Sequence, residues 1–297
     1  VRFAVQLGMD IAPDTRVAIQ QHAARMNIVS QERIIAELNK IIVVPMPSRG
    51  FNLLHQLDLL RIIFPDLVAL QGTETIQGQS HKDNFYHTLE VVDNICNHTE
   101  NVWLRWAALL HDIGKAPTKR FSKKIGWTFH GHELKGSKMA YHLFKRLKMP
   151  LNDKMKYVQK LVFMSSRPIV LAQENITDSA VRRLVFDAGE FVEDLMTLCE
   201  ADITTKNPYK FKKYHNNFKL VREKIIEVEE RDHVRNFQPP ITGEEIMTLF
   251  NLKPSREIGI LKEAIKEAIL DGEIPNEHQA SYEFMIEKGK QLGLKLT

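Results

Sequence analysis

The chain has 297 residues, of which 43% are hydrophobic and 26% charged, and its formal net charge is +4. These values are ordinary for a water-soluble globular protein, and no apolar run approaches the roughly 20 residues that a bilayer span needs. We therefore expect a cytoplasmic protein with no membrane segment, whose mild positive charge favours the approach of a polyanion. Cys96 and Cys199 lack metal-site spacing and are expected to be reduced.

The first part of the chain, residues 1–70, is predicted to form several short helices. Pro13 and Ser30 each begin an apolar pattern of helical spacing, and a Pro- and Gly-containing turn at 45–50 precedes a third helix. Scattered arginines on these helices either face a nucleic acid or are simply solvated. The sequence begins at Val1, inside an element already under way, so we expect a fragment of a longer protein.

Residues 71–215 contain most of the unusual polar residues. A polar loop at 71–80 precedes a predicted helix over 84–96, with His87 near its start. Further helices follow, and one of them ends at Asp202. Between them lies a basic loop, in which a small hairpin would fit. Four of its side chains would attract a phosphate group: Lys119, Arg120, Lys123 and Lys124.

The most informative stretch is WLRWAALLHDIGKAP, residues 103–117. Its first eight residues are apolar on nearly every side, which predicts a buried helix, and a glycine and a proline end it just after His111 and Asp112. Burying an imidazole and a carboxylate without partners would cost about 2 kcal/mol or more each. Hydrogen bonds or a metal ion must therefore satisfy these two groups.

Residues 216–297 are again predicted to be helical. A capping box runs from Thr242 to Glu245, and an amphipathic pattern follows through Ile258 and Ile265. We find no pattern of a β-sheet and no internal repeat. The sequence thus predicts an all-α fold in three parts, with a neck and body at 1–70, a second domain at 71–215 and a helical tail at 216–297.

Four polar residues share a position near the end of an apolar helix: His87, His111, Asp112 and Asp202. An all-helical bundle can bring such positions to one point. Two imidazoles and two carboxylates suit Mn, Fe, Co, Ni or Mg with open coordination positions better than a closed zinc site. Such a metal acidifies water and polarises a phosphoryl oxygen, which indicates hydrolysis of a phosphate ester, and Lys115 is placed to bind the phosphate. Taken singly, each residue also fits a structural role as a core histidine or a helix cap.

Several motifs resemble known families. HDIGK, the later GHE and the late aspartate are similar to the HD superfamily of metal-dependent phosphohydrolases. RFAVQLGMDIAPDT and SQERIIAELNKIIVVPMPSRGFNLLHQLDLLRIIFPDL resemble the neck and body of bacterial CCA-adding tRNA nucleotidyltransferases and poly(A) polymerases. TDSAVRRLVFDAG, CEADITTKNP and the tail are similar to the HD-containing members of that family, so that the resemblance covers essentially the whole chain.

The resemblance implies specific site residues. The positions that match its primary metal ligands are His87, His111, Asp112 and Asp202. His132 in GHE, rather than His130, matches a further site histidine, and we assign catalytic roles to Asp112, Lys115 and His132. Related HD domains often have another histidine where this chain has Ser165, so we predict at most one tightly held divalent ion.

The resemblance also implies partners. The family's nucleotidyltransferase head, with its Gly-Ser segment and paired carboxylates, is not in this sequence, so we expect no nucleotide addition by the fragment alone and binding of ATP and CTP only through a head. The expected partners are tRNA and a small phosphate ester or cyclic nucleotide. Cations interleaved with aromatics after residue 205 predict tRNA contacts, unless the aromatics lie in the core. The predicted tRNA-binding residues are Arg182, Arg183, Lys206, Lys210 and Lys213.

Three hypotheses follow. The leading one is a fragment of a CCA-adding tRNA nucleotidyltransferase, with tRNA-binding helices and an HD domain that hydrolyses 2′,3′-cyclic phosphodiesters or phosphate monoesters. In the second, the HD domain is catalytically weak and only positions RNA. The third is a free-standing HD nucleotidase, against which the neck and tail resemblance argues. The identity of the metal, the hydrolytic substrate and the oligomeric state stay open.

Overall fold

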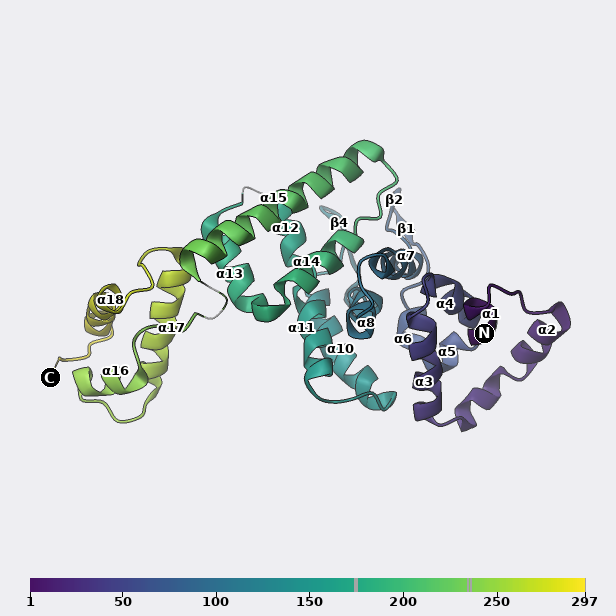
Figure 1. Ribbon diagram of the computed structural model, residues 1–297, viewed down its shortest axis with the longest axis horizontal. Helices are drawn as coiled ribbons and strands as arrows, with labels where there is room; N and C mark the ends of the chain where they lie inside the picture. The colour runs from purple at the N-terminus through teal and green to yellow at the C-terminus, as the bar shows by residue number, and fades with distance from the viewer. Residues whose placement is uncertain (174–175, 234, 236, 297) are drawn as a thin grey trace. The chain divides into compact units, whose positions relative to one another are not determined.

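The computed structural model describes residues 1–173, 176–233, 235 and 237–296 (Figure 1). The chain forms two compact units, of which unit 1 comprises Val1–Ile169 and Glu193–His215, and unit 2 comprises Val170–Val192 and Asn216–Thr297. The described residues form helices and two small hairpins, which confirms the predicted all-α class. None of the described helices is both long and apolar enough to cross a bilayer. The division at residues 70 and 215 remains a prediction.

Unit 1 contains these helices: α1 (Arg2–Gln6), α2 (Pro13–Gln21), the 3-10 helix η1 (Ala23–Ile28), α3 (Gln31–Ile42), α4 (Pro47–Gln56), α5 (Leu60–Ile63), α6 (Pro65–Val68), α7 (Asn84–Cys96), α8 (Val102–Leu110), α9 (Lys115–Thr118), α10 (His132–Arg146) and α11 (Asp153–Met164). Unit 2 contains α13 (Asp178–Ala188), η2 (Gly189–Phe191), α16 (Gly243–Phe250), α17 (Arg256–Asp271) and α18 (His278–Gln291). Residues of both units occur in α12 (Arg167–Gln173), α14 (Val192–Ala201) and α15 (Pro208–Asp232).

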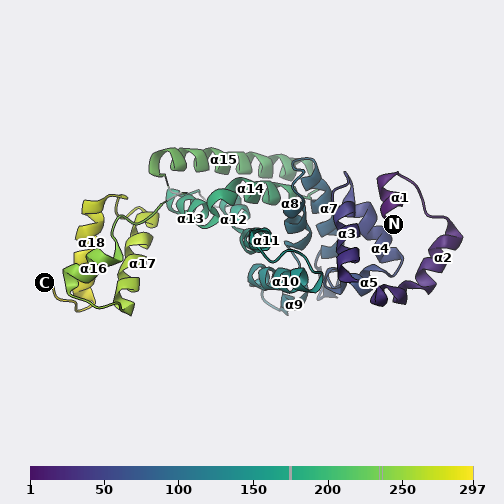
Figure 2. The ribbon, with the colours of Figure 1, turned by 60° about the horizontal axis from the view of Figure 1, so that its bottom comes forward.

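The core of unit 1 is the packing of α8 against α7 and α11, with α10 alongside α11 (Figures 1 and 2). Every residue of α8 from Leu104 to Leu110 is buried, as the mostly apolar run predicted, and this includes Arg105. Asp83 caps α7 by accepting hydrogen bonds from two backbone N–H groups, and Asn101 caps α8 by accepting one from the backbone N–H of Trp103. These caps fix where the two site-bearing helices begin.

One buried cation joins α8 to the N-terminal helices. The side chain of Arg105 is nearly inaccessible and donates hydrogen bonds to the backbone carbonyls of Thr99, Ile42 and Val44. Burying a guanidinium is tolerated only when its donors are satisfied. Arg105 therefore ties the end of α3 to the start of α8.

Two hairpins interrupt the helices of unit 1. Strands β1 (Thr75–Ile76) and β2 (Gln79–Ser80) pair antiparallel, as do β3 (Arg120–Ser122) and β4 (Gly126–Thr128). The second occupies the basic loop in which a small hairpin was expected. The first was not predicted, because its strands are two residues long and fully exposed, without any apolar alternation to signal them.

Candidate metal centre

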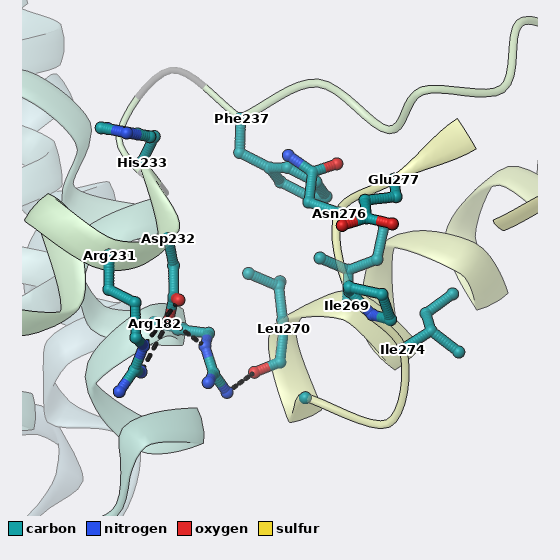
Figure 3. Close-up of a pocket in the computed structure, with 12 residues that line it drawn as sticks. Arg182, Arg231, Asp232, His233, Phe237, Ile269, Leu270, Ile274, Asn276 and Glu277 are labelled. Carbon is teal, nitrogen blue, oxygen red and sulfur yellow. Dashed lines mark hydrogen bonds and ion pairs between the residues drawn. The ribbon is translucent and has the colours of Figure 1, made fainter. Parts of the chain in front are cut away.

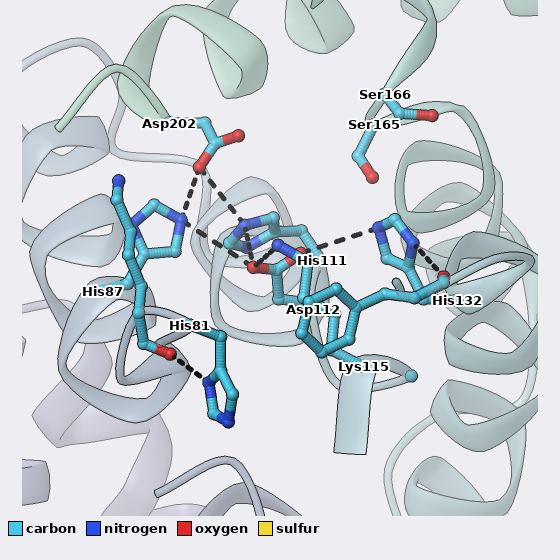
Figure 4. A network of polar contacts seen from close by, with 12 residues as sticks. His81, His87, His111, Asp112, Lys115, His132, Ser165, Ser166 and Asp202 are labelled. Carbon is cyan, nitrogen blue, oxygen red and sulfur yellow. Dashed lines mark hydrogen bonds and ion pairs between the residues drawn. The ribbon is translucent and has the colours of Figure 1, made fainter. Parts of the chain in front are cut away.

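Three elements deliver the clustered side chains of unit 1. His87 lies in the first turn of α7, His111 and Asp112 follow the last residue of α8, and Asp202 follows α14. Figure 4 shows these four side chains directed toward one another from their separate helices. The helix ends thus converge as the sequence pattern predicted.

The distances within the cluster are short. Nε2 of His87 lies 2.7 Å from Oδ1 of Asp202, and Nε2 of His111 lies 3.5 Å from the same oxygen. His87, His111 and Asp202 each offer one ligand atom, and these three atoms lie within 4.8 Å of one another. This spacing suits three ligands of one cation.

Backbone and hydroxyl groups set the orientation of both imidazoles. Nδ1 of His111 donates to the carbonyl oxygen of Ala108 at 2.8 Å, and Nδ1 of His87 lies 3.0 Å from Oγ1 of Thr204. Each ring is therefore held by its Nδ1 atom, which leaves Nε2 directed into the cluster. Metal-binding histidines in proteins are usually fixed in this way.

Two atoms of the cluster are buried without any hydrogen-bond partner in the structure, namely Nε2 of His111 and Oδ1 of Asp202. The 2.7 Å approach of His87 to Asp202 does not have hydrogen-bond geometry. Leaving a buried polar atom unpaired costs about 1–3 kcal/mol. A divalent cation would satisfy both atoms, so the residues present fit a metal.

The charges of the cluster are strongly coupled. Burial lowers the pKa of His111, but the neighbouring carboxylates of Asp112 and Asp202 outweigh it and raise the pKa to about 10. Burial raises the pKa of both carboxyls, whereas the facing imidazoles hold each of them below its ordinary value, with Lys115 contributing at Asp112. The lowered pKa values keep Asp112 and Asp202 ionised, with positively charged groups facing both carboxylates.

Asp112 adjoins the three-ligand group and also contacts a lysine. Its Oδ2 lies 3.4 Å from Nε2 of His111 and 3.7 Å from Nε2 of His87, while Nζ of Lys115 donates to the same oxygen at 2.7 Å. Only 3% of the Asp112 side chain is exposed, against 22% for Lys115. Lys115 therefore neutralises Asp112 and still reaches the solvent side of the cluster.

His132 begins α10 on the other side of Asp112. Its Nδ1 donates to the carbonyl oxygen of Phe129 at 3.0 Å, and its Nε2 lies 3.8 Å from Oδ1 of Asp112. Gly114 makes this approach possible, since a Cβ there would lie 2.7 Å from the backbone nitrogen of Gly136 and closer still to the carbonyl oxygen of His132. The glycine of HDIGK, expected only to end a helix, thus lets α10 pack against the end of α8.

The position expected to hold a further histidine carries a small buried side chain. Oγ of Ser165 donates to the carbonyl oxygen of Val162, and the next residue, Ser166, donates to Glu133 at 2.6 Å. Neither hydroxyl is a strong ligand for a second cation. One tightly held ion per chain remains our prediction.

Thr204 and Lys82 are two neighbours of the site that the sequence pattern does not single out. The Thr204 hydroxyl holds His87, and Nζ of Lys82 lies 3.5 Å from that hydroxyl. In the sequence, Lys82 is a loop residue before α7, and Thr204 is a loop residue after α14. Only their spatial contact with a histidine on another helix distinguishes them.

The structure ties two of the predicted tRNA-binding residues into ion pairs of unit 2. Nε of Arg182 donates to Asp232 at 2.7 Å in the wall of a cavity of about 550 Å³ (Figure 3). Arg183 contacts Asp271 at 2.9 Å and Glu267 at 2.6 Å. These partners account for both guanidinium groups, so a tRNA role for them would have to compete with existing ion pairs. The cavity lies in unit 2, whereas the metal-ligand cluster lies in unit 1.

The other three predicted tRNA-binding residues are exposed. Lys206 precedes α15, and Lys210 and Lys213 lie in its first two turns. Tyr209 is 79% exposed and Phe211 45% exposed, so these two aromatics are not core residues. The first turns of α15 therefore present both cations and aromatic rings to solvent.

Comparison with known proteins finds two family matches and several relatives. Residues 8–70 match the family described as "Probable RNA and SrmB- binding site of polymerase A", and residues 84–207 match the HD domain family. An A-adding tRNA nucleotidyltransferase of Deinococcus radiodurans is 30% identical over 288 residues, which cover 94% of this chain and 64% of that protein. A CC-adding tRNA nucleotidyltransferase of Thermus thermophilus is 27% identical over 294 residues, with 94% and 63% covered.

A solved structure shares the fold. The CCA-adding enzyme of Bacillus stearothermophilus in complex with CTP superposes with a TM-score of 0.58 at 18% identity, covering 98% of this chain and 60% of that one. The chain thus spans less than two thirds of the length of each of these relatives. Through its RNA-binding and HD matches, and over nearly its whole length, the chain is thus similar to bacterial tRNA nucleotidyltransferases.

Proposed function

We propose that the HD site hydrolyses phosphate esters with one bound divalent ion. The observation that carries this proposal is the pair of buried atoms that lack a hydrogen bond, Nε2 of His111 and Oδ1 of Asp202, within a group of three ligand atoms. A hydrogen-bonded structural cluster would not leave both of them unsatisfied. Mn, Ni, Co, Fe and Mg all suit the mixed nitrogen and oxygen donors.

The cation would supply a Lewis acid for the phosphoryl oxygen and a water of lowered pKa. His87, His111 and Asp202 would hold it, with Asp112 beside them. Lys115 lies on the exposed side of Asp112, where its ammonium group can bind a phosphate oxygen. Nε2 of His132 is free of the backbone bond made by Nδ1, so it can exchange a proton with a leaving group.

The test is hydrolysis by metal-stripped protein of 2′,3′-cyclic AMP and a generic phosphodiester, with Mn, Ni, Co or Mg added back. We expect activity that requires metal and is abolished in Asp112→Ala. Asp153→Ala is the matched control, because Asp153 is an exposed carboxylate whose ion pair, among the described residues, is with the exposed Lys156. A folded protein that is inactive with every metal would refute the proposal and favour a module that only positions RNA.

The whole protein's activity is proposed from the relatives. They add A or CC to tRNA, and we propose that this chain binds tRNA for nucleotide addition to its 3′ end, which would use ATP and CTP bound by a nucleotidyltransferase head. The exposed start of α15 supports this, since cations alternate there with exposed aromatic rings.

Charge reversal at Lys210 and Lys213 tests the tRNA surface. We expect weaker tRNA binding. The slope of log affinity against log salt concentration should fall by the amount that corresponds to about two lost phosphate contacts. Reversal at Lys288 and Lys290, in the last turn of α18, is the control for overall charge. Unchanged affinity and salt slope in the α15 variant would remove this surface from the proposal.

A further inference from the structure

The two hairpins of unit 1 form one structure, which we call the hairpin cap (residues 75–80 and 120–128). Trp127 of β4 donates from Nε1 to the carbonyl oxygen of Gln79 in β2 at 3.0 Å, and Lys119 forms an ion pair with Glu74. Gly126 has a φ of +88°, and a Cβ there would collide with the side chain of Gln79. A hydrogen bond and an adjoining ion pair thus join the two hairpins, so we treat the cap as one structural unit rather than two separate loops.

The hairpin cap is connected to the metal-ligand cluster on both sides. β4 leads into Phe129, whose carbonyl oxygen holds His132. β2 leads through His81 and Lys82 into α7, and Lys82 contacts the same Thr204 hydroxyl that holds His87. Figure 4 shows His81 beside the cluster, with Lys115 on the same side. The cap therefore adjoins, along the chain, the residues that hold His132 and His87.

Three cations of the hairpin cap have no acidic partner among the described residues. Arg120, Lys123 and Lys124 are exposed, and none of them forms an ion pair within the described residues. By contrast, the neighbouring Lys115 and Lys119 pair with carboxylates. Three like charges within five positions repel one another and do not stabilise the fold. Binding of an external anion would relieve this repulsion.

The strand register separates the two roles of the second hairpin. Phe121 and Trp127 are direct cross-strand partners with ring centroids 5.3 Å apart, and Trp127 contacts His81 at 4.9 Å. Side chains alternate across a strand, so Arg120 points to the opposite face. The aromatic face anchors the hairpin, while the other face and the turn present positive charge.

We infer that the hairpin cap binds successive phosphates of a single RNA strand and directs its terminal phosphate ester to the HD site. This rests on the proposed function and names its substrate class. A mononucleotide has one phosphate, for which Lys115 is sufficient. Three further cations on a rigid cap fit the phosphodiester chain that leads to a strand end.

The test compares two substrates that share the same reacting group. One is 2′,3′-cyclic AMP and the other is a short oligoribonucleotide that ends in a 2′,3′-cyclic phosphate. In the triple variant Arg120→Glu, Lys123→Glu, Lys124→Glu, we expect kcat/KM for the oligonucleotide to fall about tenfold or more and its salt slope to fall by about 2. Hydrolysis of 2′,3′-cyclic AMP, which has a single phosphate, should fall by no more than about twofold, because the three cations attract it only from a distance. Lys82 is left intact because it contacts the residue that holds His87.

The matched control reverses three exposed charges of unit 1 far from the site, at Lys145, Lys148 and Lys154. Lys145 lies about 20 Å along α10 from His132. We expect this variant to behave as the unmodified chain with both substrates. Equal losses on both substrates in the cap variant, or no loss on the oligonucleotide, would overturn the inference.

A binding measurement keeps this inference separate from the proposed function. If the unmodified chain hydrolyses neither substrate, the proposed hydrolysis fails, and the binding of a labelled oligoribonucleotide to the metal-loaded chain decides the inference. A salt slope lower by about 2 in the cap variant alone would support the hairpin cap as an RNA site. The same slope in the cap variant, the control variant and the unmodified chain would overturn it.

Discussion

Replacing Gly114 by alanine should separate the ends of α8 and α10. The backbone dihedrals of Gly114, φ −74° and ψ −12°, suit any residue, so the only cost of a side chain there is steric. A Cβ would lie 2.7 Å from the nitrogen of Gly136, whereas ordinary contacts begin near 3.4 Å. The backbones must therefore move apart by roughly 0.7 Å or more, because no flexible side chain is available to yield.

We expect Gly114→Ala to lower the free energy of unfolding by about 3 kcal/mol, the upper range for overpacking a closely packed site. It should also weaken metal binding, since His132 and the end of α8 both move. The assay is urea unfolding followed by tryptophan fluorescence, because Trp103, Trp106 and Trp127 all lie in unit 1, together with titration of the stripped protein with Mn.

The control for Gly114→Ala is a helical glycine in open space. A Cβ at Gly259, inside α17, would meet nothing within 4 Å. Gly259→Ala should leave unit 1 unchanged and stabilise α17 by about 0.5–1 kcal/mol, which circular dichroism would detect. A Gly114→Ala protein as stable as the unmodified chain, with unchanged Mn affinity, would refute the close-approach account.

Two further predictions concern buried and paired charges. Arg105→Met should lower the free energy of unfolding by about 3 kcal/mol, because two buried carbonyl groups and one part-buried carbonyl group lose their donor. Arg61→Met, which breaks an exposed pair with Asp58, should cost about 1 kcal/mol or less, and urea unfolding measures both variants. Arg231 and Arg182 hold the pKa of Asp232 at about 2, against an ordinary 3.8, so its stabilising contribution is present above about pH 4 and is lost as the pH falls toward 2. Asp232→Asn should therefore make the free energy of unfolding less dependent on pH between about pH 4 and pH 2. An unchanged pH dependence in this range would contradict the assigned pairing.

Features with a local physical cause could be predicted from the sequence. The helix at 84–96 matches α7, and the capping box from Thr242 to Glu245 is present with both of its hydrogen bonds. The buried α8 follows from a run that is apolar on nearly every side. In each case the residues that make the sequence pattern are the same neighbouring residues that form the structural feature. The feature therefore does not depend on contacts with distant parts of the chain.

Features set by distant contacts could not be predicted in this way. Arg182 and Arg183 are two adjacent cations in the sequence, but the partners of their Nε atoms, Asp232 and Asp271, lie about 50 to 90 positions away. The role of Thr204 depends on a histidine that precedes it by 117 positions. The convergence of His87, His111 and Asp202 was predicted only because each lies at the end of an apolar helix, and the resemblance to HD proteins selected this set from many polar helix ends.

The most direct measurement for the candidate metal centre is the hydrolysis rate of 2′,3′-cyclic AMP as Mn is titrated into metal-stripped protein, with Asp202→Asn measured alongside. We expect a rate that rises from the baseline and saturates at one ion per chain. The Asn variant should require far more Mn, because it loses a charged ligand of the three-atom group. Saturation at two ions per chain would contradict the single-ion site. A rate that does not depend on Mn, or that responds equally in the variant, would contradict the metal centre itself.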